Sequence, residues 1–351
     1  MTTLIERIIK NSPTKHTSVL SESTFFTDKD TVQTDIPIVN IAFSGTIDGG
    51  FTAGLTLLAG PSRVFKSYLA LNCVKNYLER YSDGVCILYD SEGGITPEYL
   101  ITMGVDPSRV VHVPIEHIEM LKFDIVKQLK EINRGDKVII VIDSIGNTAS
   151  LKELEDALEE KSKAEMQRAK SIKGLFRMVT PSLVVKDIPC VAICHTYQEM
   201  ALYPKQIISG GTGLIYSANT AFIISRAQEK EGTEVTGWNF TLNVEKSRFV
   251  KEKSKLTFRV MYDGGIYKYS GLLELAIESG HLVKDGHSYR FVDSATGEVS
   301  ETKVKEKSIT EEMWNNLLAD KKFKEFIKNK YMLSNTRSMI AELADEEEID
   351  E

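Results

Sequence analysis

Residues 60–67 read GPSRVFKS, between an apolar run and a segment with the pattern of a helix. Lys66 and Ser67 form the ending of a phosphate-binding loop, in which backbone N–H groups between a strand and a helix surround bound phosphates. Phe65 stands where the usual pattern has a second glycine. Taken alone, this pattern is weak evidence for a phosphate-binding loop, because a turn with a surface lysine can have the same sequence.

The flanking residues strengthen the phosphate-loop interpretation. LTLLAG precedes the loop as an apolar strand, and SYLALNCVKNYL follows it as a helix. This order places a helix N-terminus at the phosphates of ATP. We expect Lys66 to be a solvated cation that reaches the β- and γ-phosphates, Ser67 to ligate Mg²⁺, and the Phe65 ring to point away. The predicted ATP-binding residues of the loop are Gly60, Pro61, Ser62, Arg63, Val64, Phe65, Lys66 and Ser67.

Three further apolar runs end in polar residues. VIIVIDS carries Asp143, which we expect to hold the metal. VCILYDSE ends in Glu92, whose carboxylate can polarise the water that attacks the γ-phosphate. CVAICHT carries His195, which can sense whether the γ-phosphate is present. Each is unremarkable alone, since apolar strands often end in such residues. In an open α/β sheet the carboxyl ends of parallel strands meet at one crevice. The four strand ends together therefore predict one nucleotide site.

The order of these runs predicts the fold class. Apolar runs of four to seven residues alternate with helical segments, which indicates a largely parallel sheet covered on both faces. We predict an α/β protein with three parts: an N-terminal oligomerisation arm at 1–45, an ATPase core at 46–270, and a small C-terminal α/β domain with an acidic tail at 271–351.

The composition of the chain bears on its cellular compartment and on the partners it can bind. The four cysteines lie in apolar runs without metal-ligand spacing, which favours reduced thiols and a cytoplasmic protein. No apolar run reaches the length of a membrane span, so we expect no membrane association. The net charge is −7, but six acidic residues lie in the last seven, Asp345–Glu351, so the rest of the chain is nearly neutral and can carry a basic groove. The tail is either a solvated terminus or a competitor for a basic surface.

The motifs in order resemble the RecA family of DNA strand-exchange recombinases. They are GPSRVFKS, YDSEGGITPEYL, VIIVIDSIGNTAS, CVAICHTYQ, ISGGTGLIYSA, LNVEKSRFVKEKS and YDGGIYKYSGLLELAIESG. The resemblance implies a RecA-type P-loop core. It also implies an ATP-dependent recombinase that forms helical filaments on single-stranded DNA, pairs it with homologous duplex, and serves recombination, repair and recombination-dependent replication.

The resemblance also implies roles around the nucleotide. Tyr99 matches the aromatic residue that stacks on adenine, and Lys246 and Arg248 match paired cations that reach the ATP of a neighbouring subunit. Residues two apart on a strand share a face, so both charges can point at one phosphate group. The predicted catalytic residues are Lys66, Glu92, Asp143, His195, Lys246 and Arg248, and the predicted metal ligands are Ser67 and Asp143.

Two segments match the family's DNA-binding loops. Residues 198–213 are glycine-rich and match the second loop. Residues 152–163 match the first, but their acidic residues are unlike a DNA contact, so the following helix offers better candidates. The predicted DNA-binding residues are Lys170, Arg177, Tyr197, Lys205, Gly210 and Gly211.

The resemblance implies single- and double-stranded DNA, further copies of the chain, a recombination mediator and a single-strand-binding protein as partners. Three alternatives compete with this interpretation. A ring-shaped replicative helicase has the same fold, but the short N-terminal arm leaves no room for a primase-binding domain. A clock-type or signalling ATPase that assembles without DNA has no use for the glycine-rich segment, and a structural filament that does not hydrolyse ATP needs neither Glu92 nor His195. Hydrolysis measured with and without single-stranded DNA separates them.

Overall fold

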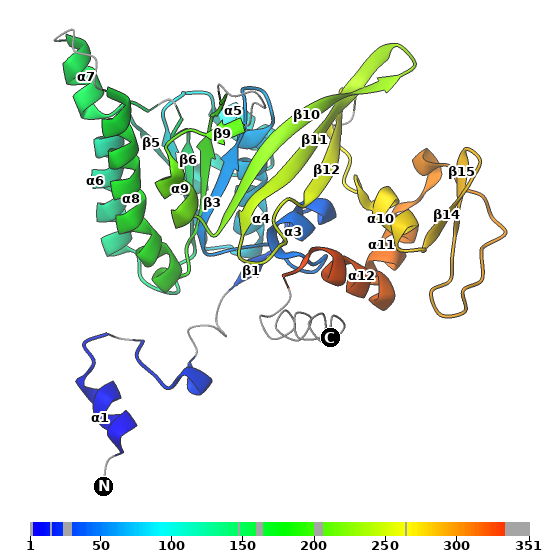
Figure 1. The fold of residues 1–351 in the computed structure, drawn as a ribbon, viewed down its shortest axis with the longest axis horizontal. Coiled ribbons are helices and arrows are strands. Elements are labelled where there is room, and N and C mark those ends of the chain that lie inside the picture. Colours follow the sequence, from blue (N-terminus) through cyan, green and yellow to red (C-terminus); the bar gives the residue numbers. More distant parts are fainter. Residues whose placement is uncertain are drawn as a thin grey trace, which may run out of the picture.

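The computed structural model describes residues 3–14, 16–23, 30–146, 148–158, 164–199, 206–263 and 265–333 (Figure 1). A nine-stranded sheet runs through the centre, in the order β13-β12-β11-β10-β3-β7-β6-β4-β5. The strands from β10 to β5 in this order are mutually parallel, and β11, β12 and β13 continue the sheet as antiparallel neighbours. Their bounds are β3 (Gly54–Ala59), β4 (Val85–Asp90), β5 (Val110–Pro114), β6 (Val138–Asp143), β7 (Pro189–Cys194), β10 (Thr220–Glu231), β11 (Glu234–Ser247), β12 (Lys255–Met261) and β13 (Gly265–Ile266).

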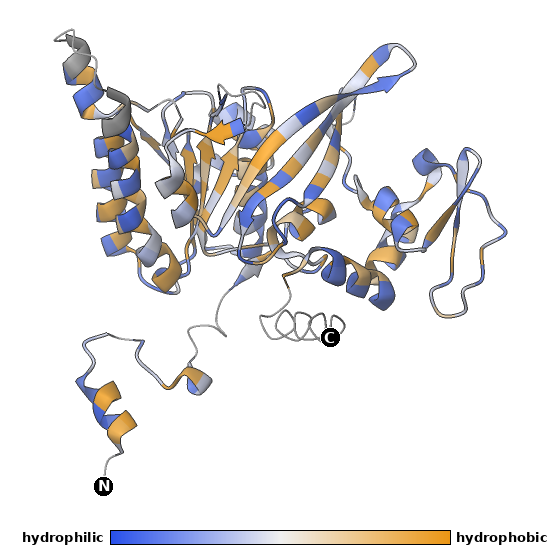
Figure 2. Cartoon of the chain, viewed as in Figure 1, coloured by the Kyte–Doolittle hydropathy of each residue, from blue (hydrophilic) through white to orange (hydrophobic). Residues whose placement is uncertain are grey.

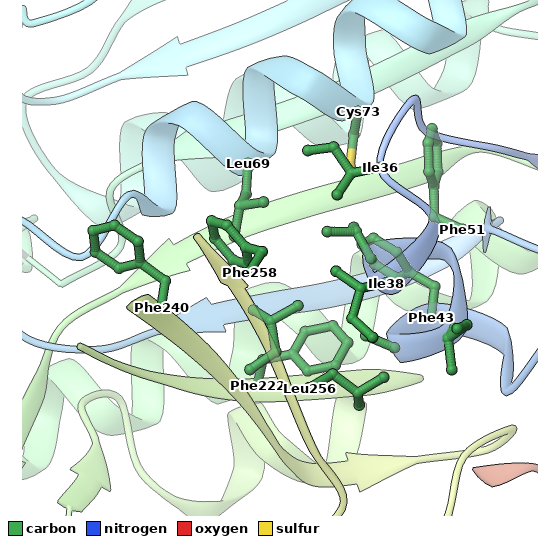
Figure 3. Close-up of a cluster of buried hydrophobic side chains, with 14 of the residues drawn as sticks. Ile36, Ile38, Phe43, Phe51, Leu69, Cys73, Phe222, Phe240, Leu256 and Phe258 are labelled. Carbon is green, nitrogen blue, oxygen red and sulfur yellow. The ribbon is translucent and has the colours of Figure 1, made fainter. Parts of the chain in front are cut away.

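Helices cover both faces of this sheet because its central strands are apolar on both sides. Along β3, Leu55 and Leu57 enter the hydrophobic cluster beneath the helices α6, α8 and α9, whereas Leu58 enters the cluster beneath α3 and α4. Figure 3 shows part of the second cluster, with Leu69 of α4 beside aromatic rings from β11 and β12 and with Phe222 of β10 beside Phe43 of α3. The helices are α3 (Pro37–Ser44), α4 (Lys66–Arg80), α5 (Pro97–Thr102), α6 (Ile118–Glu131), α7 (Leu151–Leu158), α8 (Ala164–Lys186) and α9 (Thr212–Ser217). The predicted α/β class is confirmed.

Two helices of the N-terminal region differ in how far they are buried. Helix α1 (Leu4–Asn11) lies apart from the sheet, with a hydrophobic side formed by Leu4, Ile5 and Ile8 that is more than half exposed (Figures 1 and 2). Helix α3, by contrast, buries every residue from Pro37 to Phe43. The predicted arm at 1–45 therefore includes a helix that packs in the core, because its apolar residues surround the helix instead of forming one stripe.

The remaining short elements connect these layers. They are η1 (Leu20–Glu22), β1 (Thr31–Val32), β2 (Phe51–Thr52), η2 (Pro107–Arg109), β8 (Thr196–Gln198) and β9 (Gln206–Ile208). Strands β8 and β9 pair antiparallel just after β7. All four cysteines are buried and none forms a disulfide. No helix in the described part of the chain is long and apolar enough to cross a membrane.

A smaller unit follows the sheet. It consists of α10 (Leu272–Glu278), β14 (Leu282–Asp285), β15 (Ser288–Phe291), η3 (Glu306–Ser308), α11 (Glu311–Ala319) and α12 (Lys321–Tyr331). Trp314 of α11 stacks on Tyr269, with ring centroids 5.6 Å apart, so this unit shares a continuous hydrophobic cluster with the core. The acidic tail lies outside the described residues.

Candidate nucleotide site

The phosphate loop connects β3 to α4. Phe65 caps the helix in the left-handed backbone region, with φ 62°, which explains why other loops of this kind have glycine there. The Phe65 ring packs 4.6 Å from the ring of Phe240 and 5.3 Å from that of Tyr68, measured between centroids. These aromatic contacts offset the cost of about 1–2 kcal/mol for this conformation in a residue with a side chain.

Lys66, the first residue of α4, is buried rather than solvated. Its side-chain Nζ donates to the backbone oxygens of Gly60, at 3.0 Å, and Pro61, at 2.6 Å, and the residue is only 7% exposed. Burial lowers the pKa of Lys66, and the nearby carboxylates of Asp143 and Glu92 oppose that change. The expectation of a solvated cation is therefore wrong, because the loop folds over its own lysine.

Asp143 ends β6 within the same site and is 5% exposed. The pKa of Asp143 is raised to about 6, mainly because the carboxyl group is buried. The nearby carboxylates of Glu92 and Asp90 also raise this pKa, whereas a hydrogen bond from Ser67 lowers it. A hydroxyl and a carboxylate with a raised pKa suit Mg²⁺, which takes one or two protein oxygens and fills its other positions with water and phosphate. No cluster of three metal-ligating side chains occurs in the described ranges.

Glu92 follows β4 and is held at its carboxylate. Its Oε1 accepts a hydrogen bond from the Ser144 hydroxyl at 2.7 Å and lies 3.3 Å from Nε2 of His195. The predicted general base, Glu92, and the predicted γ-phosphate sensor, His195, are thus in direct contact. Ser144 was missed by the sequence analysis; its place directly after Asp143 was the signal that could have identified it.

These side chains open into one cavity of about 1030 Å³. The lining includes Tyr99, as expected for a residue that would contact a base. Trp238, Arg226 and Tyr262 also line it and were not predicted. The Arg226 guanidinium lies 4.3 Å from the centre of the Trp238 ring and donates to the Arg63 backbone oxygen at 3.0 Å. Residues of β10 and β11 and the end of β12 therefore form part of the cavity wall.

Two predicted catalytic cations lie elsewhere in this protomer. Lys246 and Arg248 are not among the described residues that line the cavity. Lys246 Nζ donates to the backbone oxygens of Ile215, at 3.0 Å, and Tyr216, at 2.9 Å, at the end of α9. Burial lowers the pKa of Lys246, and the neighbouring Arg248 lowers it further. Neither cation therefore contributes to the cavity of its own chain.

The predicted DNA-binding residues that the structure describes do not line the cavity. Lys170 and Arg177 are exposed on α8, and Tyr197 of β8 is 55% exposed. Gly210 and Gly211 have φ of 104° and 81° in the turn before α9, so both need the backbone freedom of glycine. Lys205 and residues 159–163 of the first loop lie outside the described residues.

A parallel sheet whose strand ends bring together a phosphate loop, a buried aspartate and a glutamate defines a P-loop ATPase core. The family model of the RecA N-terminal domain matches residues 6–267, and the chain belongs to the RecA family. A second family model, for the C-terminal domain of the bacteriophage T4 Recombination and repair protein, matches residues 269–327. The family resemblance predicted from the motifs is confirmed.

Individual relatives agree with the family. The chain is 49% identical over 340 residues to the Recombination and repair protein of Enterobacteria phage T4 (UvsX), covering 95% of this chain and 87% of that one. It is 24% identical over 298 residues to Protein RecA of Tropheryma whipplei (81% and 65% of the two chains). It is 25% identical over 276 residues to Protein RecA of Frankia alni (76% of each).

Proposed function

We propose that the protein is a phage recombinase that assembles as a helical filament on single-stranded DNA, hydrolyses ATP to ADP and phosphate, and exchanges strands with homologous duplex. The observation that carries the proposal is the lining of one cavity, where the segments that follow four parallel strands bring together Lys66, Asp143, Glu92 and His195. RecA-family membership makes DNA-dependent ATP hydrolysis the expected activity of the class.

Each residue has a distinct role in the proposed reaction. Glu92 accepts a proton from the attacking water as the water oxygen bonds to the γ-phosphorus and the bond to the β–γ bridging oxygen breaks. Lys66 stabilises the charge that develops on the phosphate oxygens, and Tyr99 supports the base. Mg²⁺, held by Ser67 and Asp143, would neutralise charge on the β- and γ-phosphates. His195, in contact with Glu92, reports whether the γ-phosphate is present.

Assembly would complete the site. Lys246 and Arg248 do not line their own cavity, so we propose that they act at the ATP of the neighbouring subunit. DNA would contact the exposed residues of α8 and of the segment after β7, mostly through phosphates, and therefore with little sequence preference. A recombination mediator and a single-strand-binding protein would be further partners. The site of action would be the cytoplasm of the infected bacterium, in recombination, repair and recombination-dependent replication.

The test is Glu92→Gln in the full chain. The substitution keeps the side-chain shape and an oxygen for Ser144 but removes the base, so we expect hydrolysis to fall by roughly 10²-fold or more. Affinity for a fluorescent ATP analogue should be retained, and filaments on DNA should persist in electron micrographs. Glu98→Gln is the matched control, because Glu98 lies on α5 and is fully exposed.

Two outcomes would contradict the proposal. Equal loss of nucleotide binding and turnover in Glu92→Gln would make Glu92 structural. Wild-type hydrolysis that single-stranded DNA does not stimulate would indicate an ATPase that assembles without DNA.

A further inference from the structure

The main chain of Glu92 is held by a buried carboxylate that the mechanism above does not use. Asp90 ends β4 and is 4% exposed. Its Oδ1 accepts hydrogen bonds from the backbone N–H groups of Glu92 and Gly93, each at 2.8 Å. Gly93 has φ 66°, so the chain turns sharply at this point. Asp90 therefore fixes the turn that carries Glu92.

The second oxygen of Asp90 also has a partner. Oδ2 lies 3.1 Å from Nε2 of His112, whose side chain is half exposed on the edge strand β5. Strands β4 and β5 are parallel neighbours, with Leu88 opposite His112. A buried carboxylate is costly unless its oxygens are hydrogen-bonded. Here one oxygen holds the turn, and the other is satisfied from the sheet edge.

Asp90 does not resemble a second metal ligand. Oδ1 is occupied by two amides, and Asp90 is not among the described residues that line the cavity, whereas Asp143, opposite it on β6, lines the cavity. Glu92 is thus held at both ends. Ser144 and His195 contact its carboxylate, and Asp90 contacts its backbone.

We propose that Asp90 is a positioning residue for Glu92 and that His112 supports it from the edge strand. This inference rests on the proposed role of Glu92 as the base. Loss of Asp90 leaves two amides without an acceptor and frees the turn, so the carboxylate of Glu92 shifts relative to the attacking water. A displacement of about 1 Å at a reacting group can cost on the order of 10² in rate.

The experiment compares Asp90→Ala with Asp90→Asn in the full chain, by steady-state ATP hydrolysis on single-stranded DNA. For Asp90→Ala we expect kcat to fall on the order of 10²-fold with the KM for ATP nearly unchanged. Asp90→Asn keeps Oδ1 for both amides and can donate to the ring nitrogen of His112, so we expect it to restore kcat to within roughly fivefold of the wild type.

A double variant separates positioning from a general structural effect. If Asp90 acts only through Glu92, then Glu92→Gln/Asp90→Ala should be no slower than Glu92→Gln alone, because residues that act as a unit are not additive. Multiplied losses would overturn the inference. If Glu92→Gln itself kept wild-type turnover, the proposed function would fail instead.

A second aspartate in the chain holds a similar turn and provides a matched control for Asp90→Ala. Oδ1 of Asp293 accepts hydrogen bonds from the N–H groups of the residues two and three positions later, Ala295 and Thr296, in the small C-terminal unit. Asp293→Ala should leave kcat unchanged. A fall equal to that of Asp90→Ala would overturn the positioning role.

His112 keeps the inference testable if Asp90→Ala does not fold. His112→Ala removes a half-exposed side chain from an edge strand, and we expect kcat to fall by about threefold to tenfold, the equivalent of one hydrogen bond. KM should be unchanged, and His112→Gln, which retains a donor, should recover most of the loss. Full activity in His112→Ala would refute the supporting role of His112.

Discussion

The nucleotide cavity and the DNA-binding candidates differ in how their side chains are held. In the cavity, Lys66 and Asp143 are 7% and 5% exposed, and each has a hydrogen-bond partner from the loop or from α4. On the other surface, Lys170, Arg177 and Tyr197 are exposed. Buried, oriented groups stabilise charge at one point, whereas exposed groups act through screened charge and stacking. Substitutions should therefore cause large losses of chemistry in the first region and graded, salt-dependent losses of affinity in the second.

The largest effect is expected for Lys66→Ala. It removes the cation at the phosphates and leaves the backbone oxygens of Gly60 and Pro61 without their donor, so hydrolysis should fall by on the order of 10² to 10³. Phosphate release measures this, with circular dichroism to verify the fold. Lys127→Ala on α6 is the surface-lysine control. Wild-type turnover in Lys66→Ala would show that GPSRVFKS is not the phosphate site.

Asp143→Asn should weaken Mg²⁺-dependent hydrolysis while stabilising the nucleotide-free fold at high pH. The pKa of Asp143 is raised from 3.8 to about 6, so the folded state holds its proton more tightly than the unfolded state. The destabilisation by this carboxylate therefore grows as pH rises from about 4 to 6 and is complete above pH 6, where it is on the order of 1–3 kcal/mol.

Thermal melting in EDTA measures this effect. Asp143→Asn should melt at a higher temperature than the wild type at pH 8, and the gain should shrink at pH 5. The same difference in melting temperature at both pH values would exclude titration of Asp143 as its cause.

The DNA-binding candidates should give smaller and graded effects. Lys170→Ala and Arg177→Ala should each weaken single-stranded DNA binding a few-fold and reduce the slope of log affinity against log salt by about one. Hydrolysis without DNA should not change, because neither residue lines the cavity. Titrations at several salt concentrations measure the slope, with Lys127→Ala as the control. An unchanged slope would place the DNA elsewhere.

The smallest effect is expected for deletion of the tail, Asp345–Glu351. A tethered acidic segment can compete with DNA for the lysines of α12, namely Lys321, Lys322, Lys324, Lys328 and Lys330. Two of these already contact acidic side chains, since Lys324 pairs with Asp48 and Lys330 with Glu278. We expect duplex affinity to rise about twofold to threefold at roughly 50 mM salt and the gain to vanish as salt increases. If the full chain and the deletion variant bound duplex DNA equally well at low salt, the tail would be a solvated terminus that does not compete with DNA.

The residues near one another in sequence were predictable. GPSRVFKS lies between an apolar strand and a helix, and Asp143 and Glu92 end apolar runs, so periodicity and strand ends were enough to identify the site. That the Phe65 ring points away from the phosphates stays a prediction, because both Phe65 and Phe240 line the cavity. The aromatic partners of that ring could not be predicted, since Phe240 is far along the chain.

The sequence alone determined the α/β class, the phosphate loop and the polar residues at four strand ends, because each follows from local spacing. Three features depend on the folded arrangement of the chain: the burial of Lys66, the packing of α3 in the core, and the contact of Asp90 with His112 on the neighbouring strand. Burial and contacts between distant residues depend on which strands become neighbours and which helices cover them. No local pattern of side chains specifies that arrangement.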